Sequence, residues 1–225
     1  GRNNTSSGQY SVSFGYDNEV SGNYSFVSGQ MNEVSGYNSV AFGNKMNVSG
    51  AYSFGINLEP DDEGGVVNLS NDRVLAVMGG NVGIGTTNPL AKLHITDDGS
   101  ILATGTFGSG WTGDSLGAGT RLMWIPEKAA FRAGYVNGTE WNSINIGVYS
   151  AVFGRNNTAL GSASFVGGGN YNKSTGGNSF VGGGYDNTAE GGSSFIGSGD
   201  YNIASSTGSF VGAGYRNKSA GQYSF

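Results

Sequence analysis

The side chains that most often catalyse reactions are scarce in this sequence. It contains a single histidine, His94, and no cysteine, which excludes thiolate catalysis and cysteine-based metal sites. Gly83-Ile84-Gly85 begins like a dinucleotide-binding loop, but Asn88 stands where the third glycine belongs and no helical pattern follows. We therefore predict no catalytic residue, no cofactor and no cofactor-binding residue, and we interpret the protein as not being an enzyme.

Acidic residues could supply oxygen ligands to Ca²⁺ or a pair of carboxylates to a glycosidase. The acidic runs are Asp61-Asp62-Glu63 and Asp97-Asp98. Neither run fits an EF-hand loop or the glycine–aspartate repeat of calcium-binding solenoids, so we predict solvated loop acids and no metal site. A glycan-degrading activity stays open as the least favoured alternative, because sequence separation does not reveal the distance between two carboxyl groups.

Tyrosine offers recognition chemistry, because its ring can stack and its hydroxyl can form hydrogen bonds. Four tyrosines lie one or two residues before a repeated asparagine, at Tyr171, Tyr185, Tyr201 and Tyr215. Such a row could contact surface glycans. The alternative, which we favour, is that ladders of tyrosine and asparagine stabilise the fold itself, as cross-strand pairs do.

An internal repeat must position these residues. A serine recurs every 14 residues at Ser11, Ser25, Ser39 and Ser53, and every 14 or 15 residues at Ser150, Ser164, Ser179, Ser194, Ser209 and Ser224. An asparagine follows about half a repeat later, at Asn18, Asn32, Asn47, Asn157, Asn172, Asn187, Asn202 and Asn217. Two strands of about five residues and two tight turns, marked by glycine and asparagine, fit this period. Identical residues at identical positions favour parallel stacking of the copies over an antiparallel meander.

Composition agrees with a repetitive β fold. Of 225 residues 43 are glycine, which makes a helical bundle improbable because each glycine inside a helix costs about 1 kcal/mol relative to alanine. The net charge of −5 comes without a basic stripe, so we predict no nucleic-acid partner. No apolar run approaches the roughly 18 residues that span a bilayer, so we predict no membrane insertion of this segment.

Each repeat also carries one phenylalanine, placed one or three residues after its serine. These residues are Phe14, Phe26, Phe42, Phe54, Phe153, Phe165, Phe180, Phe195, Phe210 and Phe225. Positions one and three after the serine share a face of a strand, and we expect that face to point inward. A coil of 14 residues is too thin to enclose a large core alone. We therefore predict that three identical chains press these phenylalanines together as a shared trimer core.

The repeat resembles a known family. Asn38-Ser39-Val40-Ala41-Phe42-Gly43, followed by a second glycine turn and another serine strand, is similar to the head repeat of trimeric autotransporter adhesins of the YadA type. The resemblance covers about residues 1–55 and 148–225. It implies an all-β fold, namely a left-handed parallel β-roll or β-solenoid with 14–15-residue coils and three chains per head. The heptad stalk and the membrane-anchor barrel of the family are missing from the sequence, so its anchoring is not carried over.

Residues 56–147 interrupt the period and contain all three prolines and all three tryptophans. We predict a β-rich connector with short strands at 66–69, 73–77 and 92–95, and a pair of strands at 122–125 and 129–133. Residues 81–95 are similar to a segment that recurs in phage tail fibres and large bacterial surface proteins. Residues 120–134 resemble a segment that precedes adhesin-type repeats. Both resemblances imply a trimeric fibre.

Together these patterns predict two homotrimeric β-rolls, at 1–55 and 148–225, that flank the connector. We expect a structural and adhesive segment of an extracellular fibre or filament, on a cell surface or a virion tail, that attaches to a surface glycan or protein receptor. The alternative is a receptor-binding segment of a phage tail fibre. Because both ends of the sequence stop inside a coil, we also expect end-to-end association into a longer fibre.

Overall fold

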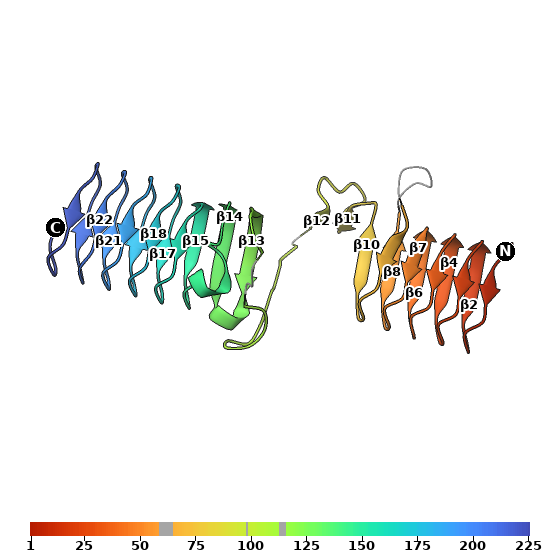
Figure 1. Ribbon diagram of the computed structural model, residues 1–225. Helices are drawn as coiled ribbons and strands as arrows, with labels where there is room; N and C mark the ends of the chain where they lie inside the picture. The colour runs from red at the N-terminus through yellow and green to blue at the C-terminus, as the bar shows by residue number, and fades with distance from the viewer. Residues whose placement is uncertain (59–64, 98, 113–115) are drawn as a thin grey trace. The chain divides into compact units, whose positions relative to one another are not determined.

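The computed structural model describes residues 1–58, 65–97, 99–112 and 116–225. It divides into two compact units, Gly1–Ile101 and Leu102–Phe225, each of which contains a stack of β coils (Figure 1). In the described residues the helical elements are two short 3-10 turns, η1 (Pro126–Lys128) and η2 (Ser143–Asn145). The prediction of an all-β protein is confirmed.

In the first unit two parallel sheets run along the stack. One sheet has the order β10-β8-β6-β4-β2, and the other β1-β3-β5-β7-β9. The strands of the first sheet are β2 (Val12–Tyr16), β4 (Phe26–Gln30), β6 (Val40–Asn44), β8 (Phe54–Asn57) and β10 (Leu75–Met78). Those of the second are β1 (Thr5–Ser6), β3 (Glu19–Val20), β5 (Glu33–Val34), β7 (Met46–Val48) and β9 (Val67–Leu69). The predicted parallel solenoid is confirmed.

The two strands of a coil are unequal, although two strands of about five residues were expected. The first strand of a coil, such as β2, has five residues, whereas the second, such as β3, has two. The stack also continues past residue 55, because β9 pairs with β7 and β10 pairs with β8 in parallel register. The strands expected at 66–69 and 73–77 therefore belong to the solenoid.

Beyond the first stack, β11 (Val82–Ile84) pairs in parallel with β12 (Leu93–Ile95), where a strand was expected at 92–95. In the second unit β13 (Gly119–Ile125) and β14 (Ala130–Val136) form an antiparallel pair around η1, which confirms the expected pairing of strands there. β14 then pairs in parallel with the first repeat strand, β15 (Ala151–Arg155). The hairpin thus provides the first strand of the second stack.

The second stack again has two sheets. Its first sheet has the order β13-β14-β15-β17-β19-β21-β23, and its second the order β16-β18-β20-β22-β24. The remaining strands have two residues each: β16 (Thr158–Ala159), β17 (Phe165–Val166), β18 (Lys173–Ser174), β19 (Phe180–Val181), β20 (Thr188–Ala189), β21 (Phe195–Ile196), β22 (Ile203–Ala204), β23 (Phe210–Val211) and β24 (Lys218–Ser219). Every pairing among these repeat strands is parallel.

The core of each coil is thin and comes from one residue of each strand. In the second stack Val166 and Val181 are buried opposite small residues such as Ala159 and Ala189. The inward position is therefore the second residue after the repeat serine, not the first or third. The expectation that the phenylalanine face points into the coil is corrected, because the narrow interior of these repeat coils holds residues such as Val181 and Ala189 and leaves the phenylalanine rings outside.

Ladders of buried serine and asparagine close the two corners of each coil. The Asn187 backbone N–H donates to Oδ1 of Asn172 at 3.0 Å, and Asn172 Nδ2 donates to the Gly184 carbonyl at 2.9 Å. These bonds satisfy polar groups at a buried turn. Asn47 does not belong to this ladder, because Met46 takes the position and its N–H donates to Oδ1 of Asn32. The Met46 side chain instead fills the space that Gly55 leaves in the core.

Many glycines are explained by the close approach of successive coils. A Cβ on Gly22 would lie 2.2 Å from the carbonyl oxygen of Gly36 in the next coil. The left-handed corner positions, in contrast, are often occupied by residues other than glycine, such as Tyr24 with φ 58° and Asn38 with φ 52°. Glycine in this fold therefore serves coil-to-coil contact at least as much as turn conformation.

Candidate functional site

The predicted trimer-core phenylalanines form a ladder in each unit. The ladder lies on the outer face of the sheet that contains β2 in the first unit and β15 in the second. In the second unit the rings of Phe165, Phe180, Phe195 and Phe210 stack nearly parallel, with centroids 4.9–5.2 Å apart and interplanar angles of 3–15°. In the first unit the rings of Phe14, Phe26, Phe42 and Phe54 are tilted, with centroids 5.4–5.9 Å apart. The residues lie together as a ladder in each unit, as the repeat spacing indicates.

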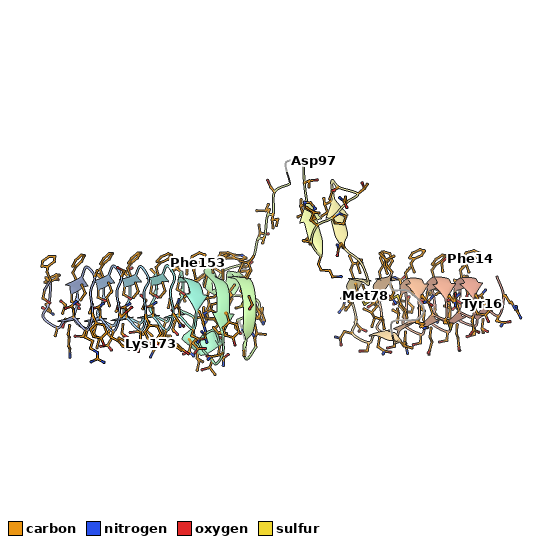
Figure 2. All side chains as sticks on the ribbon, turned by 90° about the horizontal axis from the view of Figure 1, so that it is seen from above. Phe14, Tyr16, Met78, Asp97, Phe153 and Lys173 are labelled. Carbon is orange, nitrogen blue, oxygen red and sulfur yellow. The ribbon has the colours of Figure 1, made fainter. Side chains whose placement is uncertain are left out.

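This ladder is turned toward solvent. Phe14 is 55% exposed and Phe153 is 37% exposed, and Figure 2 shows both rings projecting from their arrays. Lys173, on the other sheet, projects from the opposite side of the second array (Figure 2). Adjacent apolar residues widen the face, among them Leu75, which is 71% exposed and pairs with Phe54. Each unit therefore carries an apolar strip that the described residues of the chain leave uncovered.

The ladder of the second unit also contains a residue that the repeat pattern did not reveal. The Phe131 ring in β14 lies 5.7 Å from that of Phe153, at the position one coil earlier. On the neighbouring antiparallel strand, Trp124 pairs directly with Phe131 and is 43% exposed. Phe131 escaped notice because its segment lacks the repeat serine. Phe131 lies immediately before Arg132-Ala133-Gly134, and only the strand pairing aligns it with Ala151, the first position after the repeat serine.

The tyrosines of the second unit form a second ladder, along the corner that precedes the buried asparagines. Tyr171, Tyr185, Tyr201 and Tyr215 contact one another edge to face, with ring centroids 5.3–5.9 Å apart. Partial burial raises the pKa of the Tyr201 hydroxyl above its ordinary value, and Tyr185 adds to the effect. The stabilising ladder that we favoured is thus present in the geometry, and its rings remain accessible.

The first unit carries a corresponding tyrosine ladder at the other corner of the coil. Tyr10, Tyr24, Tyr37 and Tyr52 follow one another with centroids 5.2–5.6 Å apart. The guanidinium of Arg73 lies 6.0 Å from the centroid of Tyr52, and that of Arg216 lies 5.0 Å from the centroid of Tyr215. Both ladders therefore end against an arginine in cation–π geometry.

A buried cation stands at the start of the second stack. Arg132 in β14 is fully buried, and its guanidinium donates to the backbone carbonyls of Phe131, Ser150 and Ala159 and to Oγ of Ser150. Burial lowers its pKa to about 10. Beside it the Trp141 indole N–H donates to the Asn157 carbonyl at 3.0 Å. These two large side chains are buried in the first coil of the second stack, and we interpret their role as structural.

The residues considered for catalysis do not assemble into a reactive group. His94 accepts a hydrogen bond on Nδ1 from the Leu90 N–H at 3.2 Å. Residues 113–117 have the Gly-x-Ser-x-Gly pattern of a nucleophile elbow, but their serine, like the acids at 61–63 and 98, lies outside the described residues. Where the chain is described, no three His, Asp or Glu side chains gather in a group that could hold a metal ion.

Comparison with known proteins gives no further guide to function. A scan against protein-family models and a search of curated protein sequences both found no match to this chain. Within the described ranges, no helix is long and apolar enough to cross a membrane. We therefore base the proposed function on the phenylalanine and tyrosine ladders of the two units.

Proposed function

We propose that this chain is a structural and adhesive segment of an extracellular trimeric fibre. In the proposed assembly three copies pack their phenylalanine faces around a common axis as left-handed β-rolls. The proposal rests mainly on the solvent-exposed phenylalanine ladder, which both units display on the same sheet of their coils. Large exposed apolar strips on soluble proteins are characteristic of protein–protein interfaces.

The energetic balance favours association through this face. Covering a half-exposed phenylalanine contributes on the order of 1–2 kcal/mol from the apolar area alone. Six of the ten predicted rings are 37% exposed or more, whereas association costs roughly 4–15 kcal/mol in lost freedom of motion. The resemblance of the repeats to trimeric adhesin heads supports three chains over two.

The stacked coils suit a rigid support. Each repeat adds about 4.8 Å to the length of the stack, and each repeat strand inside a stack is hydrogen-bonded to the coils before and after it. Three identical chains would present every surface residue three times, so weak contacts with a target are strengthened by multivalency. A cell-surface location and a virion tail both fit this role, and the similarity of residues 81–95 to tail-fibre segments is the reason to retain the second.

The test is the mass of the purified full chain. We expect light scattering coupled to size-exclusion chromatography to give three times the 23.0 kDa chain mass. In the double variant Phe165→Asp/Phe180→Asp the trimer should be lost, since burying unpaired carboxylates is costly. The matched control is the double variant Thr188→Asp/Ile203→Asp, which places the same two charges on neighbouring strands of the other sheet and should leave the trimer intact. A stable wild-type monomer, or an unchanged trimer in the double variant, would contradict the proposal.

A further inference from the structure

The corner that carries the second tyrosine ladder has an alternating composition. Two adjacent positions of each coil form two columns, and parallel bridges align Asn170, Tyr185, Asp200 and Tyr215 in one of them. The neighbouring column contains Tyr171, Asp186, Tyr201 and Arg216, each one residue further along the chain. Each coil here thus contributes one tyrosine, and three of the four pair it with an amide or a carboxylate. The tyrosines change column at every step, so the ladder repeats every two coils.

The two carboxylates between these tyrosines have no partner in the described part of the chain. Asp186 is partly exposed and Asp200 is exposed, and neither side chain receives a hydrogen bond or an ion pair from the described residues. Oδ1 of Asn170 also lacks a hydrogen bond from the described residues, but it is buried and therefore closed to a ligand. In the ladder of the first unit, in contrast, Oδ1 of Asn23 accepts from the Gln9 N–H and Oδ1 of Asp72 accepts from the Ala51 N–H. The second ladder thus combines accessible rings with carboxylates that have no partner among the described residues.

We infer that the Tyr171–Tyr215 ladder binds an extended β-1,4-linked glycan, an inference that rests on the proposed adhesive function and names its ligand. A sugar ring presents an apolar face of C–H groups, which packs on an aromatic ring, and an edge of hydroxyl groups, which donate to carboxylate and amide oxygens. Tyr185 and Tyr201 are 38% and 39% exposed and supply the rings. Asp186 and Asp200 supply the acceptors.

The spacing of the ladder supports an extended chain of sugars over a single ring. The tyrosine centroids follow one another at 5.3–5.9 Å, which is comparable with the advance of one sugar in an extended β-linked glycan. Successive sugars in a β-1,4 chain are turned by about half a revolution, so such a chain repeats every two sugars as the ladder repeats every two coils. Tyrosine also loses little side-chain entropy on binding, which makes it an efficient contact residue.

A cationic ligand is the competing occupant, because aromatic rings beside carboxylates also attract ammonium and guanidinium groups. The structure already places a cation of its own there, since Arg216 lies 5.7 Å from the Tyr201 centroid and 5.0 Å from that of Tyr215. The rings of Tyr201 and Tyr215 therefore already contact a cation of the chain itself. The carboxylates of Asp186 and Asp200 are the groups without a partner among the described residues, and the hydroxyl groups of a neutral glycan can donate to them.

Calorimetric titration of the full chain tests the inference. The probes are β-1,4-linked glucose and N-acetylglucosamine oligomers of two, four and six sugars. Affinity should rise with length until the oligomer spans the four tyrosines and then level off. The double variant Tyr185→Ala/Tyr201→Ala should weaken binding about tenfold or more, because two stacking contacts are lost. The matched control, Tyr24→Ala/Tyr37→Ala in the ladder of the first unit, should leave the affinity unchanged.

Three results would overturn the inference. They are no binding of any oligomer, equal binding by the Tyr185/Tyr201 double variant, and tighter binding of tetra-arginine that Asp186→Asn/Asp200→Asn abolishes. The last result would instead identify a cation site, whose affinity also falls with added salt. Light scattering on the same samples separates the two proposals. A trimer that binds no glycan contradicts only the ligand, whereas a monomer that binds glycan contradicts only the assembly.

Discussion

At the scale of single residues, the least expected feature is a charged side chain in the core of the second stack. Arg132 occupies the inward position of β14, where later coils place valine or isoleucine. Its guanidinium has carbonyl and hydroxyl partners, but its Nε has no hydrogen-bond partner among the described residues, and no acidic partner accompanies the charge. Desolvation of an unpaired cation is costly. We conclude that Arg132 fills the wider first coil by its length and does so at a cost in stability.

Replacement of Arg132 by methionine should therefore leave the free energy of unfolding unchanged to within about 1 kcal/mol, or raise it, because the volume is retained and the charge removed. Arg132→Ala should lower it by about 2–5 kcal/mol through the cavity it leaves. Urea unfolding at neutral pH measures both. A large loss of stability in the methionine variant would show that the guanidinium hydrogen bonds outweigh the cost of burying the charge.

The pH dependence of the same comparison follows from the lowered pKa. Above a pH of about 10 the folded state releases the Arg132 proton, whereas the unfolded chain keeps it to a higher pH. The unfolded state then binds more protons, so the stability contributed by this residue rises with pH in that window. Any advantage of the methionine variant should accordingly shrink above pH 10.

At the scale of the repeat, the neighbouring glycines Gly176 and Gly177 in the turn before Ser179 have different reasons to be glycine. A Cβ on Gly176 would lie 2.1 Å from the carbonyl oxygen of Gly191 in the next coil. A Cβ on Gly177 would meet its nearest neighbour, the Ser162 carbonyl, at 3.9 Å, and serine or threonine occupies the aligned position in other coils. The first glycine is thus required by coil stacking, and the second is not.

We expect Gly176→Ala to push successive coils apart and to lower the melting temperature by several degrees or more. Gly177→Ala should leave it unchanged or raise it slightly, because alanine restricts the unfolded chain by an amount worth about 0.4–1 kcal/mol. Differential scanning calorimetry of the two variants gives the comparison. Equal melting temperatures would mean that the coil spacing relaxes readily at this turn.

At the scale of the whole molecule, the proposed assembly couples folding to association. The thin cores of the two stacks bury mainly valine, alanine and serine, whereas the largest apolar side chains, the phenylalanines, face outward. The greatest reserve of hydrophobic stabilisation therefore lies between chains in the proposed trimer and not within one chain.

The melting temperature of the wild-type chain should then increase with protein concentration, because association stabilises the folded state by mass action. We expect a rise of several degrees over a hundredfold range of concentration. The Phe165→Asp/Phe180→Asp variant should melt at a lower temperature that does not depend on concentration. A wild-type melting temperature that is independent of concentration would count against a trimer that dissociates on unfolding.

The repeat spacing alone determined the parallel solenoid, the phenylalanine ladder and the tyrosine ladder. This was possible because a fixed period with identical residues forces each of them into a column along the stack. The pairing of β13 with β14 was also predictable from the sequence, since two alternating apolar runs flank Pro126-Glu127-Lys128. The residues at which the stacks begin and end were not predictable, because β9, β10 and β14 join the stacks through backbone hydrogen bonds without the repeat serine.

Only the tertiary structure decided which face of the strand points inward. Alternation in sequence separates two faces but does not say which one the coil encloses. The answer follows from the width of the coil, which admits Val181 beside Ala189 and leaves the ring of Phe180 outside. The tertiary structure likewise showed that the carboxylates of Asp186 and Asp200 have no hydrogen-bond partner among the described residues, whereas the carboxylate of Asp72 in the first ladder accepts from the Ala51 N–H. Hydrogen bonds between coils depend on distances that spacing in the sequence does not contain.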